Sequence, residues 1–326
     1  MRRYILARLL WAGPIVLAIV VVTFLIIHIV PGDPIQALVG DFPTPPGYAE
    51  KIREDFGLDK PLTTQLWLYL SNLAQGNLGF SFSNRQPVLG LVLDRARYTL
   101  LLMVPALTLA AMLGITMALA AAPRAGGLID SAITGLSVAG FSIPIFWLGQ
   151  ILVIVFAIQF PLLPAQGMVS ARESLQGWPW MRDVLWHMVL PVFSITIFYV
   201  AMVARVARAS VLEALSQDFV MTARAKGLSR RTVLWQHVLP NAMIPVVTVI
   251  GYNFGHSLTG AILVETVFAW PGLGSLFITS IGNRDYPVLL GIFLVSAIAV
   301  VIANLITDIL YAALDPRVRS SYGKHA

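Results

Sequence analysis

Four polar side chains interrupt a long apolar segment, and they are the candidates for contact with a solute. They are Asn253, His256, Ser257 and Thr259. Facing lipid they would be costly, because hydrocarbon offers no hydrogen-bond partner, so they face protein or a water-filled pathway. Gly251 and Gly255 give the same segment a small-xxx-small surface on which another helix can pack closely. Lining of a pathway and hydrogen bonding between packed helices both fit this pattern.

A second cluster is basic and lies in the predicted cytoplasmic loop 205–237. Ser216 can cap a helix that runs to Gly227, a residue that can take the left-handed conformation past a helix end. Ser229 can cap a second helix over 230–238. The pattern predicts a helix–glycine–helix elbow that projects into the cytosol toward another surface. A basic loop that rests on lipid headgroups is the alternative.

The sequence lacks the motifs of the common enzyme classes. It has no GxxxxGK[ST] phosphate loop, no HExxH, no G-x-S-x-G and no cysteine, and its five histidines are scattered. We therefore expect no catalytic residue, no metal site and no cofactor in this chain. Ion-coupled transporters usually keep a midplane carboxylate or paired unwound helices, and neither pattern occurs here. Uphill transport would need an outside source of energy.

Composition places these residues in a membrane protein. The chain has 326 residues, of which 57% are hydrophobic and 12% charged, with a mean hydropathy of +0.79. A soluble domain has about 25% charged residues. Charge-free stretches long enough to cross a bilayer, for which about 20 residues suffice, are 9–30, 98–123, 131–171, 184–204, 238–264 and 286–307. Pro161 and Pro164 end the third near Phe160, so the sequence predicts an all-α, multi-pass protein with six transmembrane helices.

The basic residues predict the orientation of these helices. Arg2, Arg3 and Arg8 precede the first, which we interpret as an uncleaved span because no cleavage site follows it. With both termini in the cytoplasm, the termini and inner loops carry most of the Lys and Arg once the long segment between the first two spans is set aside. The net charge of +6 is then a topology signal and not a sign of nucleic-acid binding. We divide the chain into an N-terminal segment with the first span (1–30), an external cap (31–97), a five-helix core (98–313) that contains the loop 209–240, and a cytoplasmic tail (314–326). Within the cap we expect a helix over 49–57, a second from 61, a short strand over 79–82 and a third helix over 88–97.

Several short motifs occur in an order that resembles the permeases of ABC importers, in the dipeptide, oligopeptide and nickel branch. They are Pro31-Gly32-Asp33-Pro34, Gly57-Leu58-Asp59-Lys60-Pro61, Thr222-Ala223-Arg224-Ala225-Lys226-Gly227, Leu239-Pro240-Asn241-Ala242, Glu265-Thr266-Val267-Phe268-Ala269-Trp270-Pro271-Gly272-Leu273-Gly274, Arg284-Asp285-Tyr286-Pro287-Val288 and Asp315-Pro316-Arg317-Val318-Arg319. The third matches the "EAA" loop of the family, although Met221-Thr222-Ala223 stands where the general motif has Glu-Ala-Ala.

The resemblance implies a type I permease fold in a bacterial inner membrane and a set of partners. A second, homologous permease would complete the solute pathway. Two ATPase subunits would bind ATP and Mg²⁺, and a periplasmic or lipid-anchored binding protein would deliver short peptides. Relatives that import nickel chelates, glutathione or opines leave those substrates open. A stand-alone ion-coupled carrier or channel, and a membrane scaffold, are the alternatives from other classes.

The resemblance also assigns roles in the elbow. Ala223 and Gly227 would shape it, and Phe219 and Leu228 would bury apolar surface against an ATPase subunit. The full set carried over from the family is Phe219, Ala223, Arg224, Ala225, Lys226, Gly227, Leu228, Arg230 and Arg231. The basic members could pair with acidic groups of that subunit.

Overall fold

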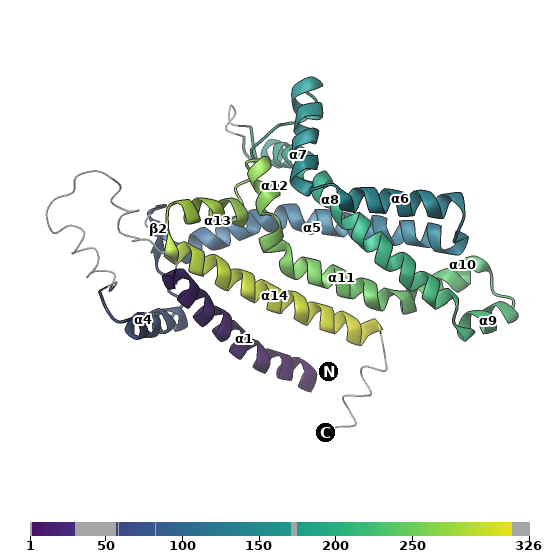
Figure 1. The fold of residues 1–326 in the computed structure, drawn as a ribbon, viewed down its shortest axis with the longest axis horizontal. Coiled ribbons are helices and arrows are strands. Elements are labelled where there is room, and N and C mark those ends of the chain that lie inside the picture. The colour runs from purple at the N-terminus through teal and green to yellow at the C-terminus, as the bar shows by residue number, and fades with distance from the viewer. Residues whose placement is uncertain (1, 30–56, 58, 82, 171–174, 315–326) are drawn as a thin grey trace.

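The computed structural model describes residues 2–29, 57, 59–81, 83–170 and 175–314. Five of its helices are long and apolar enough to cross a membrane, and a bent pair brings the number of possible spans to six. The five are α1 (Arg2–Ile29), α5 (Val88–Ala121), α8 (Trp178–Leu215), α11 (Leu239–Gly260) and α14 (Tyr286–Leu314). They run side by side along the long axis of the molecule (Figure 1). The predicted all-α, multi-pass fold is confirmed.

The third span is broken rather than kinked. It consists of α6 (Leu128–Ser142), α7 (Ile145–Val153) and the π-helical turn η2 (Ile154–Gln159), and its two halves meet at 91°. Pro144 clashes with a helical conformation of the residue before it, so Ile143 takes an extended one with ψ 123°. Pro105 and Pro191, in contrast, lie inside the continuous helices α5 and α8. The three prolines therefore affect their helices differently.

Close contact between small residues joins the long helices. Gly114 of α5 lies so near α8 that a Cβ there would be 2.9 Å from the backbone nitrogen of Ala204. On α11, Gly251 lies directly against Thr307 of α14, and a Cβ at Gly255 would be 3.4 Å from the Cβ of Ala303. The small-xxx-small surface expected from the sequence therefore packs against α14.

The described part of segment 31–97 packs at one end of the molecule, against α1, α5 and α14. It contains α4 (Leu62–Ala74) and a two-stranded antiparallel ladder of β1 (Phe80–Ser81) and β2 (Gln86–Pro87). Tyr69 of α4 stacks on Phe24 of α1, with ring centroids 5.8 Å apart, and burial raises the pKa of the Tyr69 phenol to about 12. The expected helix from 61 and the strand near 80 are confirmed, and the expected helix over 88–97 is the first part of α5. The expected helix over 49–57 lies outside the described residues, apart from Gly57.

Candidate functional site

The loop predicted to form an elbow does so at the end of α8 (Figure 1). Its first helix is α9 (Asp218–Ala225), and Gly227 follows with φ +80°, the left-handed conformation expected of it. The hydroxyl of Ser229 then accepts a hydrogen bond from the backbone N–H of Thr232 at 3.2 Å, as a helix cap does. These two residues fix the turn between the two halves of the elbow.

Two details of the elbow differ from the expectation. Ser216 does not cap α9: it ends α8, and the Ser216 hydroxyl donates to the carbonyl of Glu213. The residue directly before α9 is Gln217. The second helix does not end before Pro240. It runs from α10 (Arg230–Thr232) through the π-helical turn η3 (Val233–Val238) into α11. Pro240 lies just after this π-helical turn, and the helix continues past it. The elbow is therefore continuous with the fifth span.

The inner face of α9 anchors the elbow to the rest of the protein. Val220 and Ala223 are buried in an apolar cluster with residues of α5, α8 and η3, and Phe219 packs against its edge. The other seven residues assigned to the elbow are all exposed: Arg224, Ala225, Lys226, Gly227, Leu228, Arg230 and Arg231. Met221, which the sequence reasoning left without a role, is 69% exposed beside them. Leu228 is 37% exposed, so two large apolar side chains of the elbow are open to solvent.

The four polar candidates of the fifth span lie in different environments. Asn253 is buried, and its Nδ2 lies 3.7 Å from the sulfur of Met202 on α8. His256 is exposed and stacks on Tyr252, with ring centroids 4.3 Å apart. The side chains of Ser257 and Thr259 lie outside the described part of the structure. Asn253 thus faces the interface with α8, and His256 faces the surface of the chain.

A buried carboxylate organises the segment that follows α11, and the sequence analysis gave it no role. Glu265 lies in α12 (Ile262–Val267) and is fully buried. Its Oε1 accepts a hydrogen bond from the hydroxyl of Thr99 on α5, and its Oε2 accepts from the backbone N–H groups of Gly274 and Ser275 at 2.7 and 3.1 Å. Those two N–H groups open α13 (Leu273–Gly282), so the carboxylate caps that helix where its dipole is positive.

Further contacts hold the same hairpin, α12–α13, against α5. The indole nitrogen of the buried Trp270 donates to the carbonyl of Tyr98 at 2.9 Å, and a guanidinium nitrogen of Arg95 donates to the carbonyl of Pro271 at 3.1 Å. Each partner on α5 comes from the same turn and a half. The sequence signal for this hairpin is the run from Glu265 to Gly274, one of the motifs that resemble the permease family. The motif by itself does not predict the contacts with α5.

Comparisons with known proteins cover nearly the whole chain. Residues 110–320 match the family model described as binding-protein-dependent transport system inner membrane component, and residues 1–103 match the model of the N-terminal part of such membrane components. The dipeptide transport system permease protein DppB of Escherichia coli K12 is 37% identical over 336 residues, which covers 98% of this chain and 99% of that protein. The oligopeptide transport system permease protein AppB of Bacillus subtilis 168 is 38% identical over 319 residues, with the same coverage.

A third relative and one solved structure complete the comparison. The di/tripeptide transport system permease protein DppB of Pseudomonas aeruginosa UCBPP-PA14 is 37% identical over 333 residues, again with 98% of this chain and 99% of that protein covered. A chain from the crystal structure of an amino acid ABC transporter with histidines aligns with 70% of this chain and 94% of its own length, at 17% identity and a TM-score of 0.48.

Proposed function

This chain belongs to the family of binding-protein-dependent transport system inner membrane components, and we propose that it forms half of an import pathway for short peptides. It is a permease and a multi-pass protein of the bacterial inner membrane. The observation that carries the peptide assignment is the end-to-end similarity to permeases of dipeptide and oligopeptide systems. It favours peptides over nickel chelates, glutathione or opines.

The proposed assembly pairs this chain with a second, homologous permease. A periplasmic or lipid-anchored binding protein delivers the peptide, and two ATPase subunits bind ATP and Mg²⁺. This division of labour fits a chain whose sequence has no phosphate-binding loop.

The elbow is the proposed contact with an ATPase subunit. Val220 and Ala223 hold it to the permease, while Met221 and Leu228 present apolar surface outward. Apolar burial supplies most of the free energy at such a contact, because an exposed ion pair is worth at most about 1 kcal/mol. Arg224 and Lys226 then contribute mainly to orientation. Because the elbow is anchored and is continuous in sequence with α8 and α11, a displacement of the elbow by the ATPase subunit would move these two helices as well.

The test is reconstitution of the complex in proteoliposomes. With a sister permease, ATPase subunits and a binding protein reconstituted together with this chain, we expect uptake of a labelled dipeptide that requires ATP and the binding protein. Labelled glutathione and a nickel chelate serve as competing substrates. Uptake by this chain alone, without ATPase subunits, would instead favour the stand-alone carrier. Uptake of the nickel chelate in preference to the dipeptide would contradict the peptide assignment.

A further inference from the structure

An acidic residue organises the tight turn between α5 and α6. The turn begins with the 3-10 helix η1 (Ala122–Arg124) and ends at Asp130, in the first turn of α6. The Oδ2 of Asp130 accepts a hydrogen bond from the backbone N–H of Gly126 at 2.9 Å, and the side chain is only 6% exposed. A carboxylate in this position suits both the positive end of the helix dipole and the free N–H groups of the turn.

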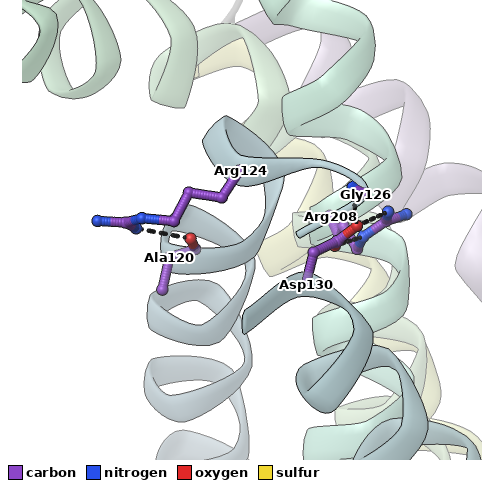
Figure 2. A network of polar contacts seen from close by, with 5 residues as sticks. All are labelled: Ala120, Arg124, Gly126, Asp130 and Arg208. Carbon is purple, nitrogen blue, oxygen red and sulfur yellow. Dashed lines mark hydrogen bonds and ion pairs between the residues drawn. The ribbon is translucent and has the colours of Figure 1, made fainter. Parts of the chain in front are cut away.

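The same carboxylate forms a two-point ion pair with α8. Nε of Arg208 lies 2.5 Å from Oδ1 of Asp130, and Nη2 of Arg208 lies 2.7 Å from Oδ2 (Figure 2). Two parallel N–H···O contacts fix the orientation of the two groups as well as their distance. Arg124, at the other side of the turn, behaves differently. It is exposed, points away from the pair in Figure 2, and donates to the carbonyl of Ala120 one helical turn earlier.

This turn is held from both sides of the elbow. Arg208 lies on α8, which runs unbroken to Leu215 and leads directly into α9. On the other side of the elbow, Arg230 of α10 donates a hydrogen bond to the carbonyl of Pro123 in η1. Ala122 also packs in the apolar cluster that buries Val220 of α9. The α5–α6 turn is thus bonded to α8, which precedes the elbow, and to α10, its second half.

We propose that the Asp130–Arg208 ion pair is a latch through which movement of the elbow reaches the broken third span. The inference rests on the proposed coupling function of the elbow. Apolar contacts are non-directional and allow helices to slide, whereas a two-point ion pair moves α6 together with α8. Because α6 leads into the 91° break at Pro144, where no continuous helix ties it to α7, a displacement of its inner end can change the angle between the two halves of the span. Asp130 and Arg208 are therefore positioning residues for transport.

The first test measures coupling in the reconstituted complex. Asp130→Asn keeps the shape of the side chain but loses its charge. We expect the ratio of peptide transported to ATP hydrolysed to fall about tenfold, which lies within the usual range of coupling between sites. The basal rate of ATP hydrolysis should stay within about twofold of the wild-type rate. Arg208→Lys keeps the charge without the planar fork, so its loss should be smaller than that of Arg208→Gln. Arg124→Gln, in the same turn, is the matched control and should leave the ratio unchanged.

The second test measures the movement itself and does not depend on the substrate. The chain has no cysteine, so Gln217→Cys at the start of the elbow and Leu128→Cys at the start of α6 accept spin labels without further changes. Both sites are exposed. In the assembled complex, we expect the distance between the labels to be the same with and without a non-hydrolysable ATP analogue. With Asp130→Asn added, the analogue should shift or broaden the distance distribution.

The outcomes separate the latch from the proposed function. An unchanged transport-to-ATP ratio in Asp130→Asn, together with a lower melting temperature, would show a purely structural ion pair and overturn the proposal. A label distance that responds to nucleotide equally in wild type and Asp130→Asn would overturn it as well. A wild-type complex that hydrolyses ATP but moves no peptide would contradict the peptide assignment, and the label distances would still decide the latch.

Discussion

The hydroxyl of Thr99 lies 2.6 Å from Oε1 of Glu265, across 166 residues of sequence. The same hydroxyl oxygen accepts the backbone N–H of Leu273 at 2.8 Å, so one side chain of α5 contacts both helices of the α12–α13 hairpin. All of these groups are buried. Since a buried polar group without a partner is costly, the contact fixes the position of the hairpin on α5.

Removal of the carboxylate should destabilise the outer end of the protein. Glu265→Ala leaves the N–H groups of Gly274 and Ser275 and the Thr99 hydroxyl without their acceptor, and each orphaned group costs about 1–3 kcal/mol. We expect a loss of at least about 2 kcal/mol in the free energy of unfolding, measured by denaturant titration of the purified chain. Glu265→Gln keeps an acceptor oxygen and should lose less. Equal losses in the two variants would contradict the capping role.

Two glycines of the hairpin should tolerate no side chain. A Cβ at Gly272 would collide with the carboxylate of Glu265, and a Cβ at Gly274 would lie 2.5 Å from the Cα of Ile262. Because backbone atoms must move to relieve such a contact, Gly274→Ala should cost about 1–3 kcal/mol of stability, as judged by thermal unfolding. Gly282→Ala is the control in the same helix, since a Cβ there would meet no atom within 4 Å. A similar loss in both variants would show that crowding is not the cause.

How much of the fold and site could be predicted depended on the range of the interactions. The spans follow from local apolar composition, and Gly227 and Ser229 follow from local backbone and capping preferences, so these predictions are confirmed. The hydrogen bond between Thr99 and Glu265 joins distant parts of the chain, and one sequence gives no signal for it. The size of the bend at Pro144 also depends on packing, because Pro105 and Pro191 are chemically alike and leave their helices unbroken.

The elbow should depend on Gly227 for conformational and not steric reasons. Its φ is +80°, and a Cβ there would meet no atom within 4 Å. Gly227→Leu places a branched side chain in the left-handed region, which costs about 1–2 kcal/mol and favours a different direction for the second half of the elbow. We expect this variant to insert normally but to lose substrate-stimulated ATP hydrolysis in the reconstituted complex. Asn tolerates the left-handed region, so Gly227→Asn should retain most of that activity. Normal coupling in Gly227→Leu would remove the elbow assignment.

The polar residues of the fifth span should separate into structural and transport roles. Asn253 is buried against Met202, so Asn253→Ala should lower the melting temperature while each folded complex transports at the wild-type rate. His256 lies at the surface of the chain, and in the proposed pair of permeases that surface is where a shared pathway can form. His256→Ala should therefore reduce uptake at unchanged stability, and Tyr252→Phe, which keeps the stacked ring, is its control. Unchanged uptake after alanine substitution at Asn253, His256, Ser257 and Thr259 together would rule out a pathway role, because no member of the polar set would then contact the solute.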